Sequence, residues 1–330
     1  MNILVTGAAG YIGSIVSEVL LSRGMQVVAL DSLAFEGHRA AVPPSAIFCQ
    51  VDLAVRPQLE EVFTKHKIDA VMHFAAEALV GKSMREPSTF YAANVACGIN
   101  LLDAVTRHGV KKFIFSSTAA TYGEPETTPI PEEHHKAPIN PYGKTKRMFE
   151  QVLADYRGYT GLHYATLRYF NAAGASAERG EAHRTETHLI PRVLDAAIGA
   201  IPALDVLGSD YPTPDGTCIR DYVHVLDIAD SHLKALENIE HVSGEAFNVA
   251  TGRGYSILEV IDVAERITGK KIPRRMQSRR PGDPATLVAS KDKLKKLLNW
   301  EAQHSSLEEI VGSAWAWKLK HPHGYDDNLR

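Results

Sequence analysis

Short apolar runs alternate with amphipathic stretches through the first half of the chain. The runs have the length of buried strands, and the stretches repeat apolar residues every three or four positions, as helices do. The runs predict strands at residues 3–5, 27–30, 47–51, 70–74, 113–116 and 163–167. The stretches predict helices at residues 11–23, 59–65, 90–107 and 142–156. This alternation is typical of an α/β fold with a doubly wound parallel sheet.

The pattern changes after Asn171. Residues 174–187 are polar and rich in Gly, Ala, Glu and Arg, which predicts a loop, while residues 211–216 and 274–284 are typical of turns. Helices are predicted at residues 189–198, 257–267 and 307–319. We therefore predict a first domain of residues 1–172 and a smaller mixed α/β domain of residues 173–330, with part of residues 219–250 packing back on the first.

Composition narrows the class of protein. Charged residues make up 23% of the 330 residues and the formal net charge is −3, so neither a nucleic-acid nor a membrane partner is indicated. No apolar run approaches the roughly 18 residues that indicate a membrane span. The first residues lack the basic start and long apolar core of a signal peptide. We expect a cytoplasmic protein.

The cysteines and histidines predict neither disulfides nor a metal centre. Cys49, Cys97 and Cys218 lie far apart and form no C-x-x-C pair, which favours reduced thiols. The densest histidine runs, at residues 134–135 and 321–323, lack the spacing of metal ligands. We therefore expect no bound metal ion.

A glycine motif stands between the first predicted strand and the first predicted helix. Gly7, Gly10 and Gly13 permit a tight turn and let backbone N–H groups approach a pyrophosphate at the helix N-terminus. Asp31 ends the second predicted strand, where a carboxylate accepts hydrogen bonds from a ribose diol and repels a 2′-phosphate. The combination predicts a Rossmann-type domain that binds NAD rather than NADP.

Candidate catalytic residues follow the fifth predicted strand, which ends in Ser116-Ser117-Thr118. Tyr142 and Lys146 open the next predicted helix four positions apart, and therefore lie on one helix face. An ammonium beside a phenol lowers the phenol pKa from its usual value of about 10. We predict that Tyr142 acts as a base near neutral pH, with Thr118 hydrogen-bonded at the same substrate oxygen.

These features resemble the extended short-chain dehydrogenase/reductases. The glycine spacing is GxxGxxG, Asp52-Leu53 follows the third strand, Phe74-Ala75-Ala76 follows the fourth, and Asn94 stands where that family has a sheet-supporting asparagine. The implied NAD contacts are Gly7, Gly10, Tyr11, Ile12, Gly13, Asp31, Ser32, Asp52, Leu53, Phe74, Ala75, Ala76, Asn94, Ser116, Tyr142, Lys146 and Tyr169.

Over nearly its whole length the chain is similar to the UDP-glucose 4-epimerase family. The segments that carry the similarity are residues 117–123 (STAATYG), 140–146 (NPYGKTK), 168–174 (RYFNAAG), 186–191 (ETHLIP), 208–225 (GSDYPTPDGTCIRDYVHV) and 279–285 (RRPGDPA). The resemblance assigns residues 173–330 to UDP-sugar binding. The implied substrate contacts are Thr118, Tyr142, Phe170, Asn171, His188, Leu189, Leu207, Arg220, Tyr222, Arg280, Asp283 and Leu287.

The resemblance also implies a mechanism and a partner. Tyr142 would take the proton of the sugar 4-hydroxyl while hydride passes to a retained NAD. The resulting 4-ketose would rotate about its link to the diphosphate, and hydride would then return to its other face. UDP-galactose and UDP-glucose would thereby interconvert. Arg220 and Arg280 would hold the diphosphate, and Asp283 the uridine ribose. A homodimer would pair through the helices at residues 90–107 and 142–156.

The sequence departs from the epimerase pattern at two positions. Ala78 stands where the family often has Lys, and Lys82 lies too far along to take that role, so we do not expect this cofactor contact. Leu287 falls where the family often has a bulky Tyr in the sugar pocket. A smaller side chain leaves room for a 2-acetamido group, so we expect some activity on UDP-N-acetylglucosamine and UDP-N-acetylgalactosamine.

Other interpretations compete with this one. A 4,6-dehydratase needs an acid and a base after Thr118, where this chain has Ala119-Ala120. Another UDP-sugar epimerase, a UDP-glucuronate decarboxylase and a non-catalytic NAD-sensing protein stay open. The arginines also have structural interpretations: Arg280 could belong to a solvated basic loop, and Arg220 to an ion pair with a nearby acid such as Asp221.

Overall fold

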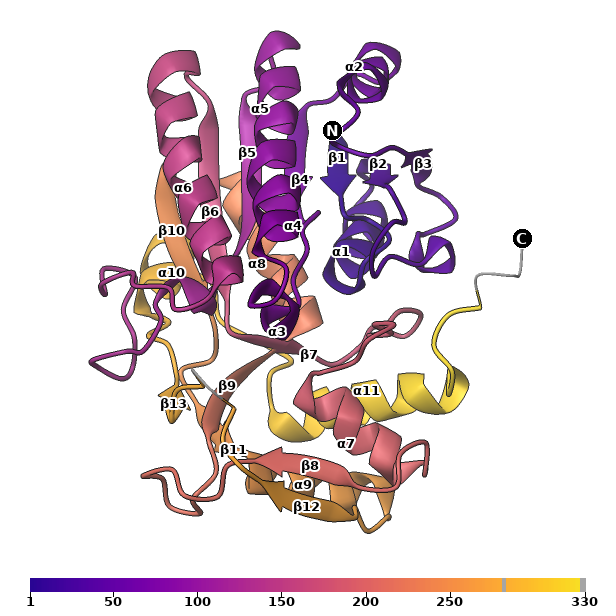
Figure 1. The fold of residues 1–330 in the computed structure, drawn as a ribbon. Coiled ribbons are helices and arrows are strands. Elements are labelled where there is room, and N and C mark those ends of the chain that lie inside the picture. Colours follow the sequence, from indigo (N-terminus) through magenta and orange to yellow (C-terminus); the bar gives the residue numbers. More distant parts are fainter. Residues whose placement is uncertain (281–282, 327–330) are drawn as a thin grey trace.

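The computed structural model describes residues 1–280 and 283–326, and within them one large sheet organises the first half of the chain. Its strand order is β10-β6-β5-β4-β1-β2-β3, and all neighbours run parallel (Figure 1). The predicted doubly wound α/β fold is confirmed. The strands are β1 (Asn2–Thr6), β2 (Gln26–Asp31), β3 (Ile47–Gln50), β4 (Ala70–His73), β5 (Lys112–Thr118), β6 (His163–Tyr169) and β10 (Glu245–Val249).

Helices cover both faces of this sheet because its strands alternate their side chains between two cores. Ile3 and Val5 of β1 pack with α1 (Tyr11–Ser22) and α8 (Val225–Glu237). Leu4, between them, packs with α2 (Arg56–Lys65), α5 (Cys97–Arg107) and α6 (Pro141–Thr160) on the other face (Figure 1). The strand in the middle of the sheet is therefore apolar on both of its faces at these positions.

The helix predicted at residues 90–107 is interrupted. It begins as α4 (Pro87–Tyr91), passes through a π-helical turn (Ala92–Ala96) and continues as α5. The turn contains Asn94, whose side chain bonds the backbone of Glu77 and the hydroxyl of Thr145. Apolar periodicity could not predict the interruption, because π-turns arise where local bonding changes the helical register.

The smaller part of the molecule lies at the carboxyl ends of the large sheet (Figure 1). Strand β9 (Ile219–His224) is flanked by β7 (Asn171–Ala173), β11 (Gly254–Ser256) and β13 (Thr286–Leu287), and β8 (Leu204–Leu207) pairs with β12 (Arg274–Gln277). The apolar faces of α7 (Leu189–Ala197), α9 (Ile257–Thr268) and α11 (Leu307–Lys320) share one core here. Short elements are η1 (Arg39–Ala41), α3 (Val80–Ser83), η3 (Ala119–Thr121) and α10 (Asp292–Leu298).

The turn prediction for residues 274–284 is wrong at its start. Residues Arg274–Gln277 form β12, which is exposed along its whole length and so shows no apolar alternation. Residues 281–282 of the same segment lie outside the described residues. An exposed edge strand that is rich in charge is easily mistaken for a loop, because its stability comes from backbone pairing with β8.

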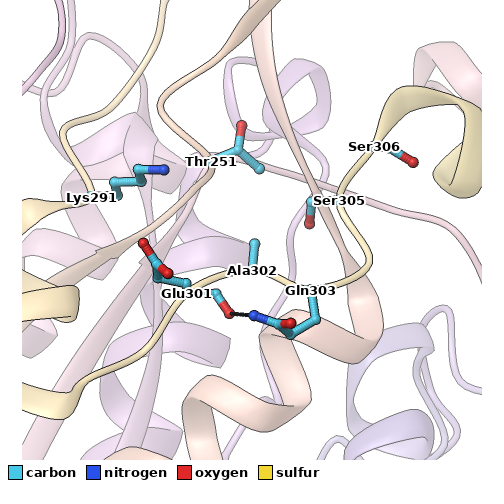
Figure 2. Close-up of a pocket in the computed structure, with 7 residues that line it drawn as sticks. All are labelled: Thr251, Lys291, Glu301, Ala302, Gln303, Ser305 and Ser306. Atoms are coloured by element: carbon cyan, nitrogen blue, oxygen red, sulfur yellow. Dashed lines mark hydrogen bonds between the residues drawn. The ribbon is translucent and has the colours of Figure 1, made fainter.

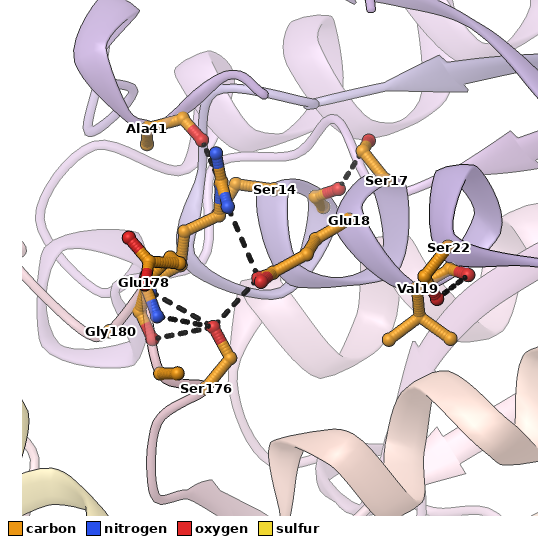
Figure 3. A network of polar contacts seen from close by, with 12 residues as sticks. Ser14, Ser17, Glu18, Val19, Ser22, Ala41, Ser176, Glu178 and Gly180 are labelled. Atoms are coloured by element: carbon orange, nitrogen blue, oxygen red, sulfur yellow. Dashed lines mark hydrogen bonds and ion pairs between the residues drawn. The ribbon is translucent and has the colours of Figure 1, made fainter. Parts of the chain in front are cut away.

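The chain crosses between the two parts more than once. Strand β10 and helix α8 come late in the sequence but pack on β6 and α1 of the large sheet. The loop after β7 also returns to α1, where Glu18 accepts a hydrogen bond from Ser176 and forms an ion pair with Arg179 (Figure 3). Arg179 also donates a hydrogen bond to the carbonyl of Ala41. The division at residue 172 stays a prediction. Among the described residues, no helix has the length and apolar composition needed to cross a membrane.

Candidate active site

The glycine turn has no room for side chains. Gly7 adopts φ +71, and a Cβ there would lie 2.6 Å from the backbone nitrogen of Ala75. The turn leads directly into α1, whose first N–H groups are free of intrahelical partners, as at every helix start. The carboxylate of Asp31 accepts hydrogen bonds from the N–H groups of Ala9 (3.0 Å) and Leu33 (2.9 Å), which fixes it at the end of β2.

The predicted cofactor residues gather at one edge of the sheet, because the carboxyl ends of parallel strands meet there. Ser32 follows β2, Asp52 and Leu53 follow β3, and the segment 74–76 follows β4. A pyrophosphate fits the Cβ-free turn at the start of α1, and a ribose diol fits Asp31. The chain's residues therefore suit NAD.

Lys82 follows the segment after β4, four positions beyond Ala78. Its Nζ lies 2.7 Å from Oε2 of the buried Glu77 and 5.7 Å from the ring centre of Phe35, in the loop after β2. Burial of Glu77 explains the pairing, because a carboxylate without a partner is costly inside a protein. Lys82 is thus held beside the cofactor edge, on Glu77.

The predicted catalytic residues meet where β5 ends and α6 begins. Asn140 caps α6 by accepting the N–H of Gly143 (2.8 Å), and Pro141 starts the first turn. Tyr142 and Lys146 follow on one helix face, with Nζ 6.0 Å from the phenol ring centre. Tyr142 hydrogen-bonds Thr118, and Lys146 Nζ donates to the carbonyl of Ser116 (2.9 Å).

The pKa of Tyr142 moves opposite to the predicted direction. Burial raises it to about 12, although the hydrogen bond from Thr118 acts to lower it. Burial also lowers the pKa of Lys146 to about 7, against the pull of Glu150, so a full ammonium is not assured near neutrality. Desolvation therefore outweighs the Tyr–Lys attraction that helix spacing suggested. The cationic nicotinamide ring of NAD favours the phenolate.

A buried polar network lies one helical turn beyond Lys146, and the sequence did not predict it. Glu150, one turn further along α6, receives two hydrogen bonds from Arg168 of β6 (2.9 and 2.7 Å) and one from Ser117 (2.7 Å). Arg168 also donates to the hydroxyl of Tyr122 (2.9 Å). The spacing of Lys146 and Glu150 on one helix face was the signal available in the sequence.

Tyr169, predicted near the cofactor, has its hydroxyl 2.6 Å from Nε2 of His232. The Nδ1 of that histidine lies 2.9 Å from the carbonyl of Ile228, so it carries the proton and Nε2 accepts from Tyr169. Burial lowers the pKa of His232 to about 4, which keeps the ring neutral. His232 comes from α8, and nothing in the local sequence pointed to it.

Predicted substrate residues from distant segments meet around β9. Arg220 forms an ion pair with Asp283, and Leu287 of β13 is its partner in register across the sheet. The alternative pairing with Asp221 does not occur. Asp221 instead accepts the N–H groups of Thr251, Gly252 and Ala289, and burial raises its pKa to about 6.

Other predicted substrate residues are more dispersed. Tyr222 is buried on β9, Leu207 ends β8, and Arg280 is exposed. The side-chain amide of Asn171 donates to the carbonyl of Asp221 (2.9 Å), so this bond serves the fold. Phe170 stands between β6 and β7.

His188 and Leu189 stand at the start of α7. His188 is the residue before the helix, and its Nδ1 lies 2.8 Å from Glu186 and 2.9 Å from Glu181. The predicted nucleotide contact is therefore held by two carboxylates of its own loop.

A polar pocket of about 350 Å³ lies beside Thr251 (Figure 2). Its other lining residues are Lys291, Glu301, Ala302, Gln303, Ser305 and Ser306, and the side-chain amide of Gln303 donates to the carbonyl of Glu301. None of its lining residues is a predicted site residue. The geometry that can perform chemistry is thus the group at β5 and α6.

Comparisons with known proteins agree with this geometry. The chain is 47% identical to the UDP-glucose 4-epimerase of Halalkalibacterium halodurans over 98% of each chain. A crystal structure of a UDP-glucose 4-epimerase superposes with a TM-score of 0.96 at 43% identity, covering 99% of this chain and 100% of that one. The Brucella ovis UDP-glucose 4-epimerase in complex with NAD superposes with a TM-score of 0.92 at 44% identity, covering 95% and 97%.

The family-level comparison covers most of the large sheet and both flanking layers. Residues 3–250, from β1 to the end of β10, match the family described as NAD dependent epimerase/dehydratase. The match includes the glycine turn, Asp31, Thr118, Tyr142 and Lys146. The chain belongs to the NAD dependent epimerase/dehydratase family.

Proposed function

We propose that this protein interconverts UDP-galactose and UDP-glucose by reversible oxidation at carbon 4 of the sugar, with NAD as its resident cofactor. The names of the relatives described above support this activity. The observation that carries it is the grouping of Thr118, Tyr142 and Lys146 at the edge of the sheet that suits NAD. The residues after Thr118 are Ala119 and Ala120, which cannot supply the acid and base of a dehydratase.

In this proposal Tyr142 moves the proton. Its hydroxyl takes the proton of the sugar 4-hydroxyl and later returns it, while Thr118 bonds the same oxygen. NAD, when bound, supplies the acceptor and donor of hydride. Lys146 is held by the carbonyl of Ser116 with its Nζ 6.0 Å from the phenol ring centre, and its protonated form favours the phenolate. No net oxidation results, so the cofactor need not leave between turnovers.

Substrate binding is assigned to the segments around β9. Arg220 and Arg280 bind the diphosphate, because guanidinium groups hold phosphate oxygens in a bidentate fork. Asp283 binds the uridine ribose, and His188, Leu189, Leu207, Phe170, Asn171 and Tyr222 complete the pocket. The proximity of Arg220, Asp283 and Leu287 supports this assignment.

The test is turnover of UDP-galactose by the purified chain without added NAD, followed as UDP-glucose in a coupled assay. We expect turnover without added NAD, because a cofactor that undergoes no net redox change should stay bound through purification. No turnover even after NAD is supplied would contradict the proposed substrate. Conversion of UDP-galactose in the wild type but not in Tyr142→Phe would assign the chemistry to this site.

We also propose activity on UDP-N-acetylglucosamine and UDP-N-acetylgalactosamine. Leu287 is smaller than Tyr and lies beside Arg220, at the assigned sugar end of the site. Leu287→Tyr should lower turnover of the N-acetylated sugars more than that of UDP-galactose. Equal effects on both kinds of sugar, or no turnover of the N-acetylated ones in the wild type, would refute this part.

A homodimer and a cytoplasmic location complete the proposal. Tyr91 of α4 and Met148 of α6 expose 36% and 41% of their surface on neighbouring helices, which favours pairing with a second copy. Met148→Lys should shift the mass measured by light scattering from dimer to monomer. The free thiols of Cys49, Cys97 and Cys218 favour a reducing compartment, which cell fractionation would check.

A further inference from the structure

Two glutamates and two histidines converge in the loop that leads into α7. They are Glu181, His183, Glu186 and His188, and one ligand atom of each lies within 4.8 Å of the other three. The Nδ1 of His188 lies 2.9 Å from Glu181 and 2.8 Å from Glu186. The Nδ1 of His183 lies 3.1 Å from the same oxygen of Glu181, whereas its 3.7 Å separation from Glu186 is to the other oxygen of that carboxylate.

The four residues are close enough together to surround one ion. Zinc lies about 2.0–2.2 Å from nitrogen and oxygen ligands, so the edges of a tetrahedral site measure roughly 3.3–3.6 Å. The observed separations of 2.8–3.7 Å lie on both sides of that range, and the two at His188 have the length of hydrogen bonds. Since all four ligand atoms lie within 4.8 Å of one another, changes in side-chain torsions can bring them around one ion.

His183 supplies a second observation. Its Nδ1 is shielded from solvent and makes no hydrogen bond of normal geometry, although Glu181 lies only 3.1 Å away. A cation bound between this nitrogen and the carboxylates would give the shielded nitrogen a partner.

The loop that carries the four residues is held on both sides. Gly180 exchanges hydrogen bonds with the hydroxyl of Tyr325 (3.0 and 3.1 Å). Arg184, between His183 and Glu186, is bound through its N–H to Glu36 (2.6 Å) and through its guanidinium to the carbonyl of Gly37 (3.2 Å). Supports of this kind preorganise a ligand set.

We propose that this loop binds one divalent transition-metal cation, best matched by Zn²⁺, through Nδ1 of His183 and His188 and one oxygen each of Glu181 and Glu186. Imidazole ligands favour zinc over magnesium or calcium, and four protein ligands are typical of a structural site. A dication also balances the two carboxylates, which are largely shielded from solvent. Its role is to fix the loop ahead of α7, and it does not depend on the proposed epimerisation.

The test uses the full-length, untagged chain after treatment with a chelator. Calorimetric titration with ZnCl₂ should give one equivalent per chain, and a raised melting temperature in its presence. His183→Gln should weaken binding at least about 100-fold, since loss of even outer-shell partners costs 10- to 100-fold. His304→Gln is the matched control, because it removes another histidine–glutamate pair, with Glu309 at 2.7 Å, and should bind zinc as the wild type does.

Cobalt(II) gives an independent readout on the wild type, should His183→Gln or its partner variant Glu181→Gln fail to fold. We expect visible bands of a four-coordinate ion without a near-ultraviolet thiolate band. A thiolate band would place the ion at Cys49 and His66, whose Sγ and Nε2 are 3.8 Å apart, and overturn the proposal. Absence of stoichiometric binding, or equal affinity in folded His183→Gln, would overturn it as well.

Discussion

Charged side chains have different kinds of partner in two regions of the molecule. One region is the pair formed by β5 and α6, and the other is the set of segments assigned to the substrate. In the β5–α6 pair, Lys146 bonds a backbone carbonyl and Glu150 bonds Arg168 of the next strand, all of them nearly inaccessible to solvent. Around β9 and α7, charged side chains pair with acidic side chains of loops instead. Arg220 pairs with Asp283, and His188, half exposed, pairs with Glu186.

The difference distinguishes charged groups that stabilise the fold from charged groups that can change partner when a substrate binds. Groups in the β5–α6 pair belong to regular elements, so replacing their partners disturbs a helix or a strand. Arg220 and Asp283 can give up their ion pair and bind a diphosphate and a ribose instead, without moving either sheet. Substitutions in the first region should therefore affect turnover and stability, and those in the second mainly KM. The predictions that follow test this division.

The largest effect is expected for Tyr142→Phe. Loss of a positioned acid–base group costs about 10²–10⁴ in rate, so kcat should fall by about 10³ while KM changes little. Steady-state assays with UDP-galactose measure this. Tyr164→Phe, which removes a hydroxyl in the core behind β6, is the control and should keep its kcat. Similar losses of kcat in both variants would show that Tyr142 has no specific role in the chemistry.

Arg168→Met should produce the largest loss of stability. It leaves the Glu150 carboxylate buried without its bidentate partner, which costs about 3–5 kcal/mol in comparable pairs. Urea unfolding at neutral pH measures the free energy of unfolding. The double variant Arg168→Met/Glu150→Leu should recover much of the loss, because no unpaired charge is left. A double variant as unstable as the sum of the single ones would disprove the coupling.

Two glycines with the same φ angle can distinguish the cost of backbone strain from the cost of a close contact with a neighbouring segment. Gly7 and Gly109 both have φ +71, but a Cβ at Gly109 meets nothing within 4 Å, whereas one at Gly7 meets Ala75 at 2.6 Å. Gly109→Ala should cost about 1–2 kcal/mol from backbone strain alone. Gly7→Ala should cost more and also reduce the NAD retained after gel filtration. Equal NAD content in the two variants would contradict the role of the turn.

Arg220→Lys tests the region assigned to the substrate. A lysine keeps the charge but loses the bidentate fork, so KM for UDP-galactose should rise about tenfold with kcat nearly unchanged. Stability should change less than in Arg168→Met, since a lysine keeps the charge opposite Asp283. A loss of stability as large as that of Arg168→Met would erase the distinction between the two regions.

The last prediction concerns the pH dependence of stability. Burial lowers the pKa of Lys146 to about 7, whereas the unfolded chain has the ordinary value of about 10.4. Between these values the unfolded state binds more protons, so this group makes stability rise with pH from about 7 to about 10. Lys146→Met should flatten that rise in urea titrations at stepped pH. An unchanged slope would show that Lys146 keeps its proton in the folded state.

The sequence by itself determined the parts that depend on local spacing. Apolar periodicity located the strands and helices of the large sheet, and the glycine turn and Asp31 follow from what a strand end and a helix start require. Tyr142 and Lys146 lie on one face because four residues make about one helical turn, whatever surrounds them. These features need no knowledge of distant segments.

Only the tertiary structure decided which charges meet and how water is excluded from them. Arg220 and Asp221 are adjacent in β9 and so point to opposite faces, which gives Arg220 the distant Asp283 instead. Strand β10 completes the large sheet from far along the chain, and Asn94 sits in a π-turn that no periodicity reveals. The pKa of Tyr142 rises because burial depends on every segment packed around it, and spacing along one helix carries no information about that.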